Sequence, residues 1–395
     1  MRQEAERCED WALSGEDCVP ATRYSPLATP YSLLSMPRPL VARIDAAALA
    51  HNLGVARAAA PRSRVMAVIK ANGYGHGLLR VARALRGADG FAVLTVDEAA
   101  QLRAEGYTHP IVLLEGFFSP DELPEITRLR LRPVIHRIDQ VDILAKARLE
   151  HRLDVLLKVD TGMHRLGLSP KRVAEALSRL RAEPRVGSVT LMTHFAGADD
   201  PAVGVADQLA VFNQLLTAPP GRGGEPVTLA NSAALLRYPE THADWVRPGI
   251  MLYGASPFPA QSGEDLGLLP AMHLESQLIA VQTLRKGEGV GYGFTFRAER
   301  DMKVGVVACG YGDGYPRHAP TGTPVLVAGR PSRILGRVSM DMLCVDLSPA
   351  PTAHVGSPVV LWGAGLPVEQ VALAAGSIAY ELLTAIAPRV RMEEA

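Results

Sequence analysis

The sequence contains little cysteine and no long apolar run. Its 395 residues include four cysteines, none of them in a CxxC pair. Four cysteines in a chain of this length do not build a disulfide framework, and the absence of a CxxC pair disfavours a zinc site. No stretch of about 18 apolar residues occurs, which is the length that a membrane-spanning helix needs. We therefore expect no metal centre and no membrane partner.

An excess of charge of one sign is also missing. The 41 lysines and arginines balance 41 aspartates and glutamates, and no basic tract is interleaved with aromatic residues. This balance disfavours nucleic acid as a partner and favours a small-molecule ligand. The hydrophobic fraction of 48% and the charged fraction of 21% are typical of a soluble globular protein. With so few cysteines, they predict a protein of the reducing cytoplasm.

The first 37 residues differ from the rest of the chain. Charged residues occur from Arg2 to Asp10, and small, polar and proline residues follow, without the apolar core of a secretory signal. We expect residues 1–37 to be a flexible N-terminal extension. The remaining length exceeds what one hydrophobic core normally supports, so two further domains are predicted.

Short apolar runs alternate with helical patterns in the first of these domains. The runs lie at 41–45, 65–71, 91–96, 111–116, 133–136, 155–160, 189–195, 227–232 and 250–254. Near-continuous apolar runs are typical of parallel strands that are buried on both faces. If the first run stands apart, eight βα units remain, which predict an α/β protein with a TIM (β/α)8 barrel over 38–270. An open, doubly wound sheet is the alternative, although no GxGxxG follows the first strand.

After residue 270 the pattern changes to strands separated by turns. Strand-like segments rich in β-branched residues lie between Gly, Pro and Ser turns, and a helical pattern returns only at about 368–387. We predict a mostly β C-terminal domain over 271–395.

Lys70 stands out in the segment VMAVIKANGYGHG, at the end of the first predicted barrel strand. Active sites of (β/α)8 barrels form at this face, and a partly desolvated lysine suits covalent chemistry with carbonyl compounds. A lysine that merely extends its amine to solvent is the alternative interpretation. From the residues alone, the two interpretations are equally good.

The same segment resembles the lysine motif of the alanine racemase family, which has fold type III. The resemblance extends from about Arg38 to the C-terminus and includes eight further motifs in the family's order. These are KVDTGMHRLG, THFAGADD, ANSAA, VRPGIMLYG, VGYGFTF, GYGDGYPR, GRVSMDM and IAYE. It implies that Lys70 carries pyridoxal 5'-phosphate as an aldimine and that the protein interconverts L-alanine and D-alanine.

The resemblance also implies roles for four polar residues near predicted strand ends. Arg165 is expected to hold the substrate carboxylate, for which a guanidinium offers two parallel donors. Lys158 is expected to point into the barrel, and the matching lysine is carbamylated in many members and braces the arginine. The resemblance places His194 beside the pyridine ring and Arg247 against the pyridine nitrogen, to which an arginine donates without giving up its proton. Without the resemblance, a structural histidine and a surface arginine are the ordinary interpretations.

Phosphate groups are usually held by hydroxyls and backbone N–H groups at loop ends. The resemblance assigns this role to Ser232, to the backbone N–H groups of Gly249 and Ile250, and to the hydroxyls of Tyr74 and Tyr380. Each of these tyrosines alone is more typical of a half-buried core residue.

Tyr292, in GVGYGFTF of the C-terminal domain, is the second catalytic candidate. A phenol is normally protonated near neutrality, so it needs a cationic neighbour to act as a base. The resemblance implies that Tyr292 reaches the barrel of a partner subunit, so that a homodimer shares its active sites. Lys70 then serves the D-face and Tyr292 the L-face of the substrate. Met340, through its backbone N–H, and Asp341 are expected to reach across in the same way.

Three positions depart from the commonest family pattern, namely Gly73, His164 and Ser339. His164 is the one expected to affect the position of Arg165. A racemase for serine, lysine or several amino acids is the main alternative function. An amino-acid decarboxylase of fold type III and a non-catalytic pyridoxal-phosphate carrier are further alternatives. Neither the preferred amino acid nor a biosynthetic as opposed to a catabolic role follows from the sequence.

Overall fold

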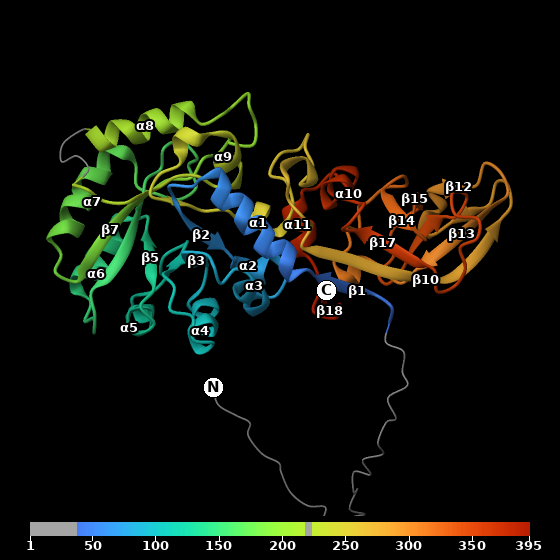
Figure 1. Cartoon of the computed structure of the whole chain (residues 1–395), viewed down its shortest axis with the longest axis horizontal. Helices are drawn as coiled ribbons and strands as arrows, with labels where there is room; N and C mark the ends of the chain where they lie inside the picture. The colour runs from blue at the N-terminus through green and yellow to red at the C-terminus, as the bar shows by residue number, and fades with distance from the viewer. Residues whose placement is uncertain (1–37, 218–222) are drawn as a thin grey trace, which may run out of the picture. The chain divides into compact units, whose positions relative to one another are not determined.

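The chain forms a closed barrel of eight parallel strands and a second, largely antiparallel sheet (Figure 1). The computed structural model describes residues 38–217 and 223–395, so the predicted N-terminal extension lies outside the described residues. The predicted (β/α)8 barrel followed by a mostly β domain is confirmed. The closed barrel also shows that the alternative of an open, doubly wound sheet is wrong.

The barrel strands are short and largely buried, because side chains fill the interior and helices cover the outside. They are β2 (Arg64–Val68), β3 (Gly90–Val93), β4 (Ile111–Leu113), β5 (Arg132–Ile135), β6 (Leu153–Lys158), β7 (Val186–Met192), β8 (Val227–Thr228) and β9 (Trp245–Val246). β9 pairs with β2 through Arg64 and Trp245, which closes the barrel.

Helices lie between successive strands, most of them along the outside of the barrel, but residues 71–74 after β2 form a left-handed turn at its mouth (Figure 1). They are α1 (Ala46–Ala59), α2 (Lys70–Tyr74), α3 (Leu78–Ala84), α4 (Val96–Ala104), η1 (Pro120–Glu122), α5 (Leu123–Arg128), α6 (Ile138–Lys146), α7 (Pro170–Ala182), α8 (Ala206–Thr217), α9 (Ser232–Arg237) and η2 (Pro239–Thr241). The periodic apolar residues of α3, such as Leu78 and Val81, are buried.

The last barrel strand is not the predicted one. Residues 250–254 were expected to form it, but Ile250–Tyr253 is a short 3-10 helix, η3, and the eighth strand is β9. Pro248 has no N–H for a strand ladder, and a fully buried apolar run fits a helix as well as a strand. As a consequence, Arg247 directly follows the last strand instead of preceding it.

Nine strands and two helices build the remainder of the chain together with β1 (Val41–Ile44). The strands are β10 (Met272–Leu284), β11 (Gly289–Val290), β12 (Phe296–Arg297), β13 (Met302–Val307), β14 (Pro324–Val327), β15 (Arg330–Leu335), β16 (Leu343–Asp346), β17 (Pro358–Trp362) and β18 (Arg391–Glu394). The helices are α10 (Val368–Ala374) and α11 (Ala379–Thr384), and short 3-10 turns are η4 (Glu264–Leu266), η5 (Tyr292–Phe294) and η6 (Tyr311–Asp313).

The long strand β10 organises the second sheet. It pairs with β17 and β1 and also with β13, so that β13, β16, β15, β14, β17 and β10 close into a ring. β1 pairs with both β10 and β18, although it precedes the barrel in the sequence. The first apolar run therefore stands apart from the barrel, as expected, while the boundary between 270 and 271 stays a prediction.

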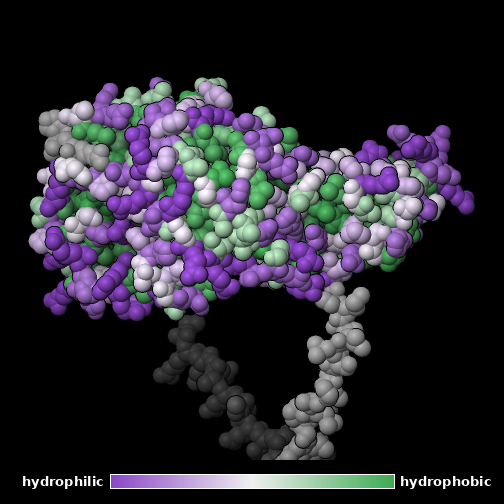
Figure 2. All heavy atoms as spheres, in the orientation of Figure 1, coloured by the Kyte–Doolittle hydropathy of each residue, from purple (hydrophilic) through white to green (hydrophobic). Residues whose placement is uncertain are grey.

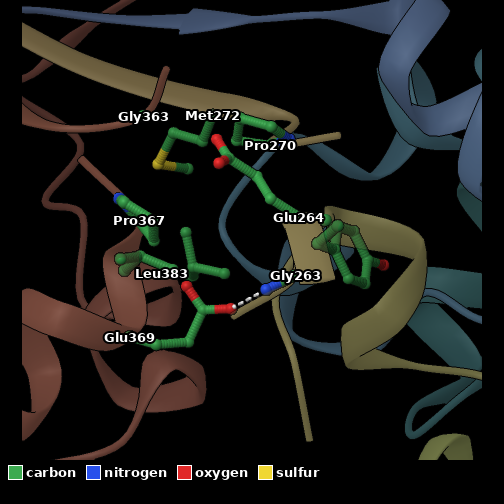
Figure 3. A pocket seen from close by; sticks show the side chains of 11 residues that line it. Gly263, Glu264, Pro270, Met272, Gly363, Pro367, Glu369 and Leu383 are labelled. Carbon is green, nitrogen blue, oxygen red and sulfur yellow. Dashed lines mark hydrogen bonds between the residues drawn. The ribbon is translucent and has the colours of Figure 1, made fainter. Parts of the chain in front are cut away.

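Glu369 joins the two parts of the structure beside a small cavity (Figure 3). This residue of α10 accepts hydrogen bonds from the backbone N–H groups of Ser256 (2.7 Å) and Gly263 (2.8 Å), which lie in the segment between the barrel and β10. The neighbouring helix α11 packs closely on the turn after β2, where a Cβ on Gly75 would lie 2.0 Å from the carbonyl oxygen of Leu383. Helix α11 thus forms part of the wall of the barrel mouth.

The visible surface is mainly polar. Figure 2 shows hydrophilic residues over much of one face, with hydrophobic residues in separate patches. Among the residues that the structure describes, no helix has the length and apolar character needed to cross a membrane.

Asn52 offers a test of this packing. On α1 it is buried, and its amide donates to the carbonyl oxygens of Leu252 (3.1 Å) and Leu269 (2.8 Å) and accepts from the Leu269 N–H (2.9 Å). Asn52→Ala should lower the free energy of unfolding by about 3 kcal/mol, because buried backbone groups lose their partners. Denaturant unfolding followed by circular dichroism measures this loss. The exposed Asn213→Ala is the matched control, and equal stability of the two variants would contradict the prediction.

Candidate active site

A cavity of about 860 Å³ opens at the carboxyl ends of the barrel strands. The side chains of α11 line it together with residues that follow β2, β6, β7, β8 and β9. Ten of the predicted site residues line this one cavity, namely Lys70, Tyr74, Lys158, Arg165, His194, Ser232, Arg247, Gly249, Ile250 and Tyr380.

A left-handed turn after β2 positions Lys70. Residues 71–74 all have positive φ, from +50° to +62°, which is a conformation that non-glycine residues adopt at a cost of about 1–2 kcal/mol each. Position 73 also requires glycine, because a Cβ there would lie 2.7 Å from Cγ2 of Val81. Such strain persists only where the surrounding structure imposes it, and it is typical of functional sites.

Four cationic side chains share the cavity. Lys70, Lys158, Arg165 and Arg247 all line it, and none of them forms an ion pair within 38–217 and 223–395. Glu115 also lines the cavity without pairing to them. Crowded positive charge without paired carboxylates favours an anionic ligand, since buried charges need partners.

Burial and mutual repulsion weaken the basicity of the two lysines. Burial, together with the charge of Arg165, lowers the pKa of Lys70. Burial and the charges of Arg247 and Arg165 lower the pKa of Lys158 to about 8. A larger fraction of each amine is therefore neutral near pH 7, which is the form that attacks carbonyl carbon or takes up a proton.

Arg247 is buried and oriented by three oxygens. Its terminal nitrogens donate to the hydroxyl of Thr228 (2.7 Å) and to the carbonyl oxygens of Thr193 (2.7 Å) and Leu229 (3.1 Å). Its Nε has no protein partner among the described residues. Burial and the charge of Arg247 keep the pKa of His194 well below its usual value, so His194 is neutral. Arg247 therefore offers a rigid donor to the cavity, and His194 offers a neutral imidazole.

The predicted phosphate ligands lie near one another in the cavity lining, around Ser232 and Tyr74. The Ser232 hydroxyl accepts from the backbone N–H of Gly249 (2.9 Å), which leaves its own proton available to a ligand. The backbone N–H of Ile250 has no partner among the described residues. Burial raises the pKa of Tyr74 to about 12 and also raises that of Tyr380, so both phenols remain protonated donors.

Tyr74 is held in place by an aromatic stack and a glycine. Its ring stacks on Tyr253 with centroids 4.5 Å apart, and the Tyr253 hydroxyl donates to the carbonyl oxygen of Val68 (3.0 Å). A Cβ on Gly249 would lie 2.6 Å from the Tyr74 hydroxyl. Glycine at this position therefore allows the hydroxyl to reach the cavity wall.

Three predicted residues lie outside this cavity. Tyr292 is 68% exposed on η5 and Met340 is 53% exposed on the loop before β16, and Asp341 follows Met340. None of them lines the barrel cavity of its own chain. The opposing base and the Met340 donor must come from another chain if they act at such a cavity.

His164 is tied to the start of the loop that carries Arg165. Its backbone N–H and its imidazole both bind the carboxylate of Asp160, at 3.0 Å and 2.9 Å, and the residue adopts a positive φ of 55°. The Asp160 carboxylate thus closes the loop, and His164 is a capping residue at its surface.

Sequence reasoning missed the residues that hold the predicted ones. Thr193 and Thr228 orient Arg247, and Tyr253 supports Tyr74. The threonines follow or end barrel strands, a position that marks them as neighbours of the cavity, but nothing in their type distinguishes them from ordinary strand residues.

At the strand ends of this parallel barrel lie a lysine of lowered pKa and three further cations without ion pairs to the described residues. This arrangement is typical of an enzyme that acts on anionic small molecules. The sequence matches "Alanine racemase, N-terminal domain" over residues 44–257 and "Alanine racemase, C-terminal domain" over residues 271–393. An alanine racemase of Thiobacillus denitrificans is 61% identical over 357 residues, which cover 90% of this chain and 96% of that protein. One of Nitrosospira multiformis is 58% identical over 360 residues, with 90% and 99% covered.

A solved structure agrees with these matches. The crystal structure of a biosynthetic alanine racemase from Pseudomonas aeruginosa superposes with a TM-score of 0.87 at 48% identity, and covers 91% of this chain and 99% of that one. The chain belongs to the alanine racemase family. It is therefore an isomerase, and its cofactor is pyridoxal 5'-phosphate, on which this family depends. The match to both domains decides against the decarboxylase and carrier alternatives.

The cavity fits this cofactor in charge and in donor chemistry. Lys70 offers an amine of lowered pKa for the aldehyde, and Ser232, Ile250 and the two tyrosines offer uncommitted donors for a phosphate. The free Nε of Arg247 suits a ring nitrogen that accepts a hydrogen bond. Arg165 remains for a second anionic group.

Substitution of Gly249 tests the fit. In Gly249→Ala the new methyl group displaces the Tyr74 hydroxyl, and we expect cofactor affinity to fall roughly tenfold because one charge-assisted hydrogen bond is lost. Titration of the cofactor-free protein with pyridoxal 5'-phosphate, followed by absorbance, measures the dissociation constant. Gly54→Ala is the matched control, since no atom lies within 4 Å of the added Cβ. Unchanged affinity in Gly249→Ala would show that the Tyr74 hydroxyl does not bind the phosphate.

Proposed function

We propose that this protein is an alanine racemase that interconverts L-alanine and D-alanine with Lys70 and a partner subunit's Tyr292 as opposing bases. The observation that carries the proposal is the cavity itself, where Lys70, whose pKa is lowered, lies with three further cations that form no ion pair with any described residue. One phosphate and one carboxylate would balance this positive charge. One relative is described as a biosynthetic alanine racemase, which supports the proposal that this protein supplies D-alanine for cell-wall peptidoglycan.

The chain's residues divide into those for the cofactor and those for the amino acid. Lys70 would hold the cofactor covalently, and Tyr74, Ser232, Gly249, Ile250 and Tyr380 would surround its phosphate. Arg247 would donate to the ring nitrogen, with neutral His194 beside the ring. Arg165 would bind the substrate carboxylate through its guanidinium.

Proton transfer would then take place between two protein groups on opposite sides of the substrate. When bound, the cofactor withdraws electrons and so makes the Cα–H of the amino acid acidic. The Nζ of Lys70 would take or give this proton on the D-face, and the phenol of Tyr292 on the L-face. Because Arg247 donates without losing its proton, transfer at Cα would remain the main path.

The exposed position of Tyr292 supports the proposal of a homodimer with shared sites. Its ring and the side chain of Met340 are exposed on the same domain, and the Met340 backbone N–H has no partner among the described residues. In the proposed dimer, the Met340 N–H would bind the substrate carboxylate and Asp341 would support this loop. A single chain would be inactive because its cavity lacks the second base.

Subunit complementation tests the two bases. Lys70→Ala should lose the bound cofactor's absorbance, while Tyr292→Phe should keep it and lose most turnover. Mixed after dissociation, the two inactive variants should regain about a quarter of wild-type racemisation, because half of the dimers are mixed and one of their two sites is intact. Circular dichroism of L-alanine measures the recovery, and L-serine and L-lysine in the same assay test specificity.

In the control, Lys70→Ala is mixed with the double variant Lys70→Ala, Tyr292→Phe. This mixture should regain no racemisation, because none of its sites contains Lys70. Full activity of Tyr292→Phe alone would show that Tyr292 is not the second base. Absence of recovery, although native mass spectrometry shows mixed dimers, would place both bases in one chain.

Lys158 is proposed to carry a carbamate that braces Arg165, so that its amine would be exchanged for an anion and Lys70, Arg165 and Arg247 would remain as the cations of the cavity. Its amine has a pKa of about 8, and a carbamate forms only on the neutral amine, so its formation should fall as the pH drops below that value. Carbon-13 NMR with labelled bicarbonate should show a carbamate signal that is absent from Lys158→Met. The exposed Lys286→Met is the control and should keep it. A signal that survives in Lys158→Met would contradict the assignment.

A further inference from the structure

The turn η6, within GYGDGYPR, lies directly against the loop that carries Met340. The N–H of Tyr311 donates to the carbonyl oxygen of Ser339 (3.0 Å), and the N–H of Gly312 donates to the carbonyl oxygen of Met340 (2.8 Å). This contact is so close that a Cβ on Gly310 would lie 2.3 Å from the Ser339 oxygen and 2.4 Å from the Met340 oxygen. The glycines of the motif are therefore required by the loop beside them.

These contacts set the direction of the Met340 N–H. In a planar trans peptide the C=O and the following N–H point in opposite directions. The Ser339 carbonyl points at η6, so the N–H of Met340 in the same peptide points away from it. A donor that faces outward without a protein partner is thus a consequence of the η6 contact.

Asp313 anchors η6 at its other end. Its side chain is fully buried and accepts from both terminal nitrogens of Arg38 (2.5 Å and 2.8 Å), from Nε of Arg389 (2.8 Å) and from the N–H of Gly310 (2.8 Å). These four hydrogen bonds fix the position of the carboxylate, because the loss of any donor would leave part of a buried negative charge without a partner.

Both arginines reach from Asp313 to the Met340 loop. Arg38 donates to the carbonyl oxygen of Asp341 (2.6 Å), and Arg389 donates to the Asp341 carboxylate (2.8 Å). A terminal nitrogen of Arg389 also donates to the carbonyl oxygen of Met340 (3.4 Å). The loop is therefore held from two sides, by η6 through its carbonyls and by the arginines through Asp341.

We infer that Asp313 is a positioning residue for substrate binding, which fixes the Met340 N–H toward the substrate carboxylate in the partner subunit's cavity. This inference rests on the proposed function. Asp313 itself touches neither substrate nor cofactor. It acts through η6 and the two arginines, which together determine where the donor points.

The test compares carboxylate binding with amine binding. In dimeric, cofactor-loaded Asp313→Asn, the KM for L-alanine and for D-alanine should rise by the same factor, about tenfold, the loss expected for one weakened hydrogen bond to a charged group. The kcat should change by less than about twofold, since the bases are untouched. Competitive inhibition by propionate, which has only the carboxylate, should weaken by the same factor as KM, while inhibition by ethylamine should not change.

Two further variants keep the test decisive. Arg389→Gln breaks the bridge at a half-exposed residue and should shift KM and propionate inhibition in the same direction, even if Asp313→Asn does not fold. Asp346→Asn is the control, because this buried carboxylate of the same sheet pairs with Arg333 away from the loop, and it should shift neither.

The inference is overturned if propionate inhibition stays unchanged in Arg389→Gln, or if propionate and ethylamine weaken equally, as a general distortion of the site would cause. Wild-type protein is measured first. If it racemises alanine and propionate inhibits it, the proposed function stands whatever the variants show. If it does not racemise alanine, the proposed function fails and the inference with it.

Discussion

The repulsion among cations at the barrel mouth is the constraint on which the site depends. Lys70, Lys158, Arg165 and Arg247 lie around one cavity without ion pairs to the described carboxylates, and burial together with neighbouring arginine charge disfavours protonation of the two lysines. The barrel holds these charges together, because Lys158 ends β6, Lys70 and Arg247 follow β2 and β9 closely, and Arg165 lies on the loop after β6. Burial and, to a smaller extent, this repulsion lower the pKa of both lysines, and the same crowded positive charge prepares the cavity for anions.

Strain at the Lys70 turn is balanced by packing from both domains. Residues 71–74 would leave the left-handed region if they were free, but Tyr74 is stacked on Tyr253 and α11 covers Gly75 so tightly that a Cβ has no room. The helix that presses on this turn also contributes Tyr380 to the cavity. The C-terminal domain therefore shapes the site of its own chain before any partner is considered.

Much of this arrangement could be predicted from the sequence, since apolar runs locate the strands and polar residues at their ends meet at one barrel face. Lys70, Lys158 and His194 follow from that rule. The strand expected at 250–254 failed because a buried helix and a buried strand have the same apolar pattern. Thr193 and Thr228, which aim Arg247, carry no signal of their own. The position of Tyr292 relative to a cavity depends on a second chain, which the pattern of one chain does not specify.

In the proposed dimer, one domain brings both the second base and the outward N–H donor to a partner's cavity. Tyr292 and Met340 lie on separate loops, yet Gly291 and the Arg337 backbone that leads to Met340 are close, with a Cβ on Gly291 lying 3.7 Å from the Arg337 carbonyl oxygen. A displacement of this domain would therefore misplace the phenol and the carboxylate donor together. The site would then lose substrate orientation and proton transfer together. A partly assembled site would therefore bind alanine poorly, and it would not hold the substrate where the second base is missing.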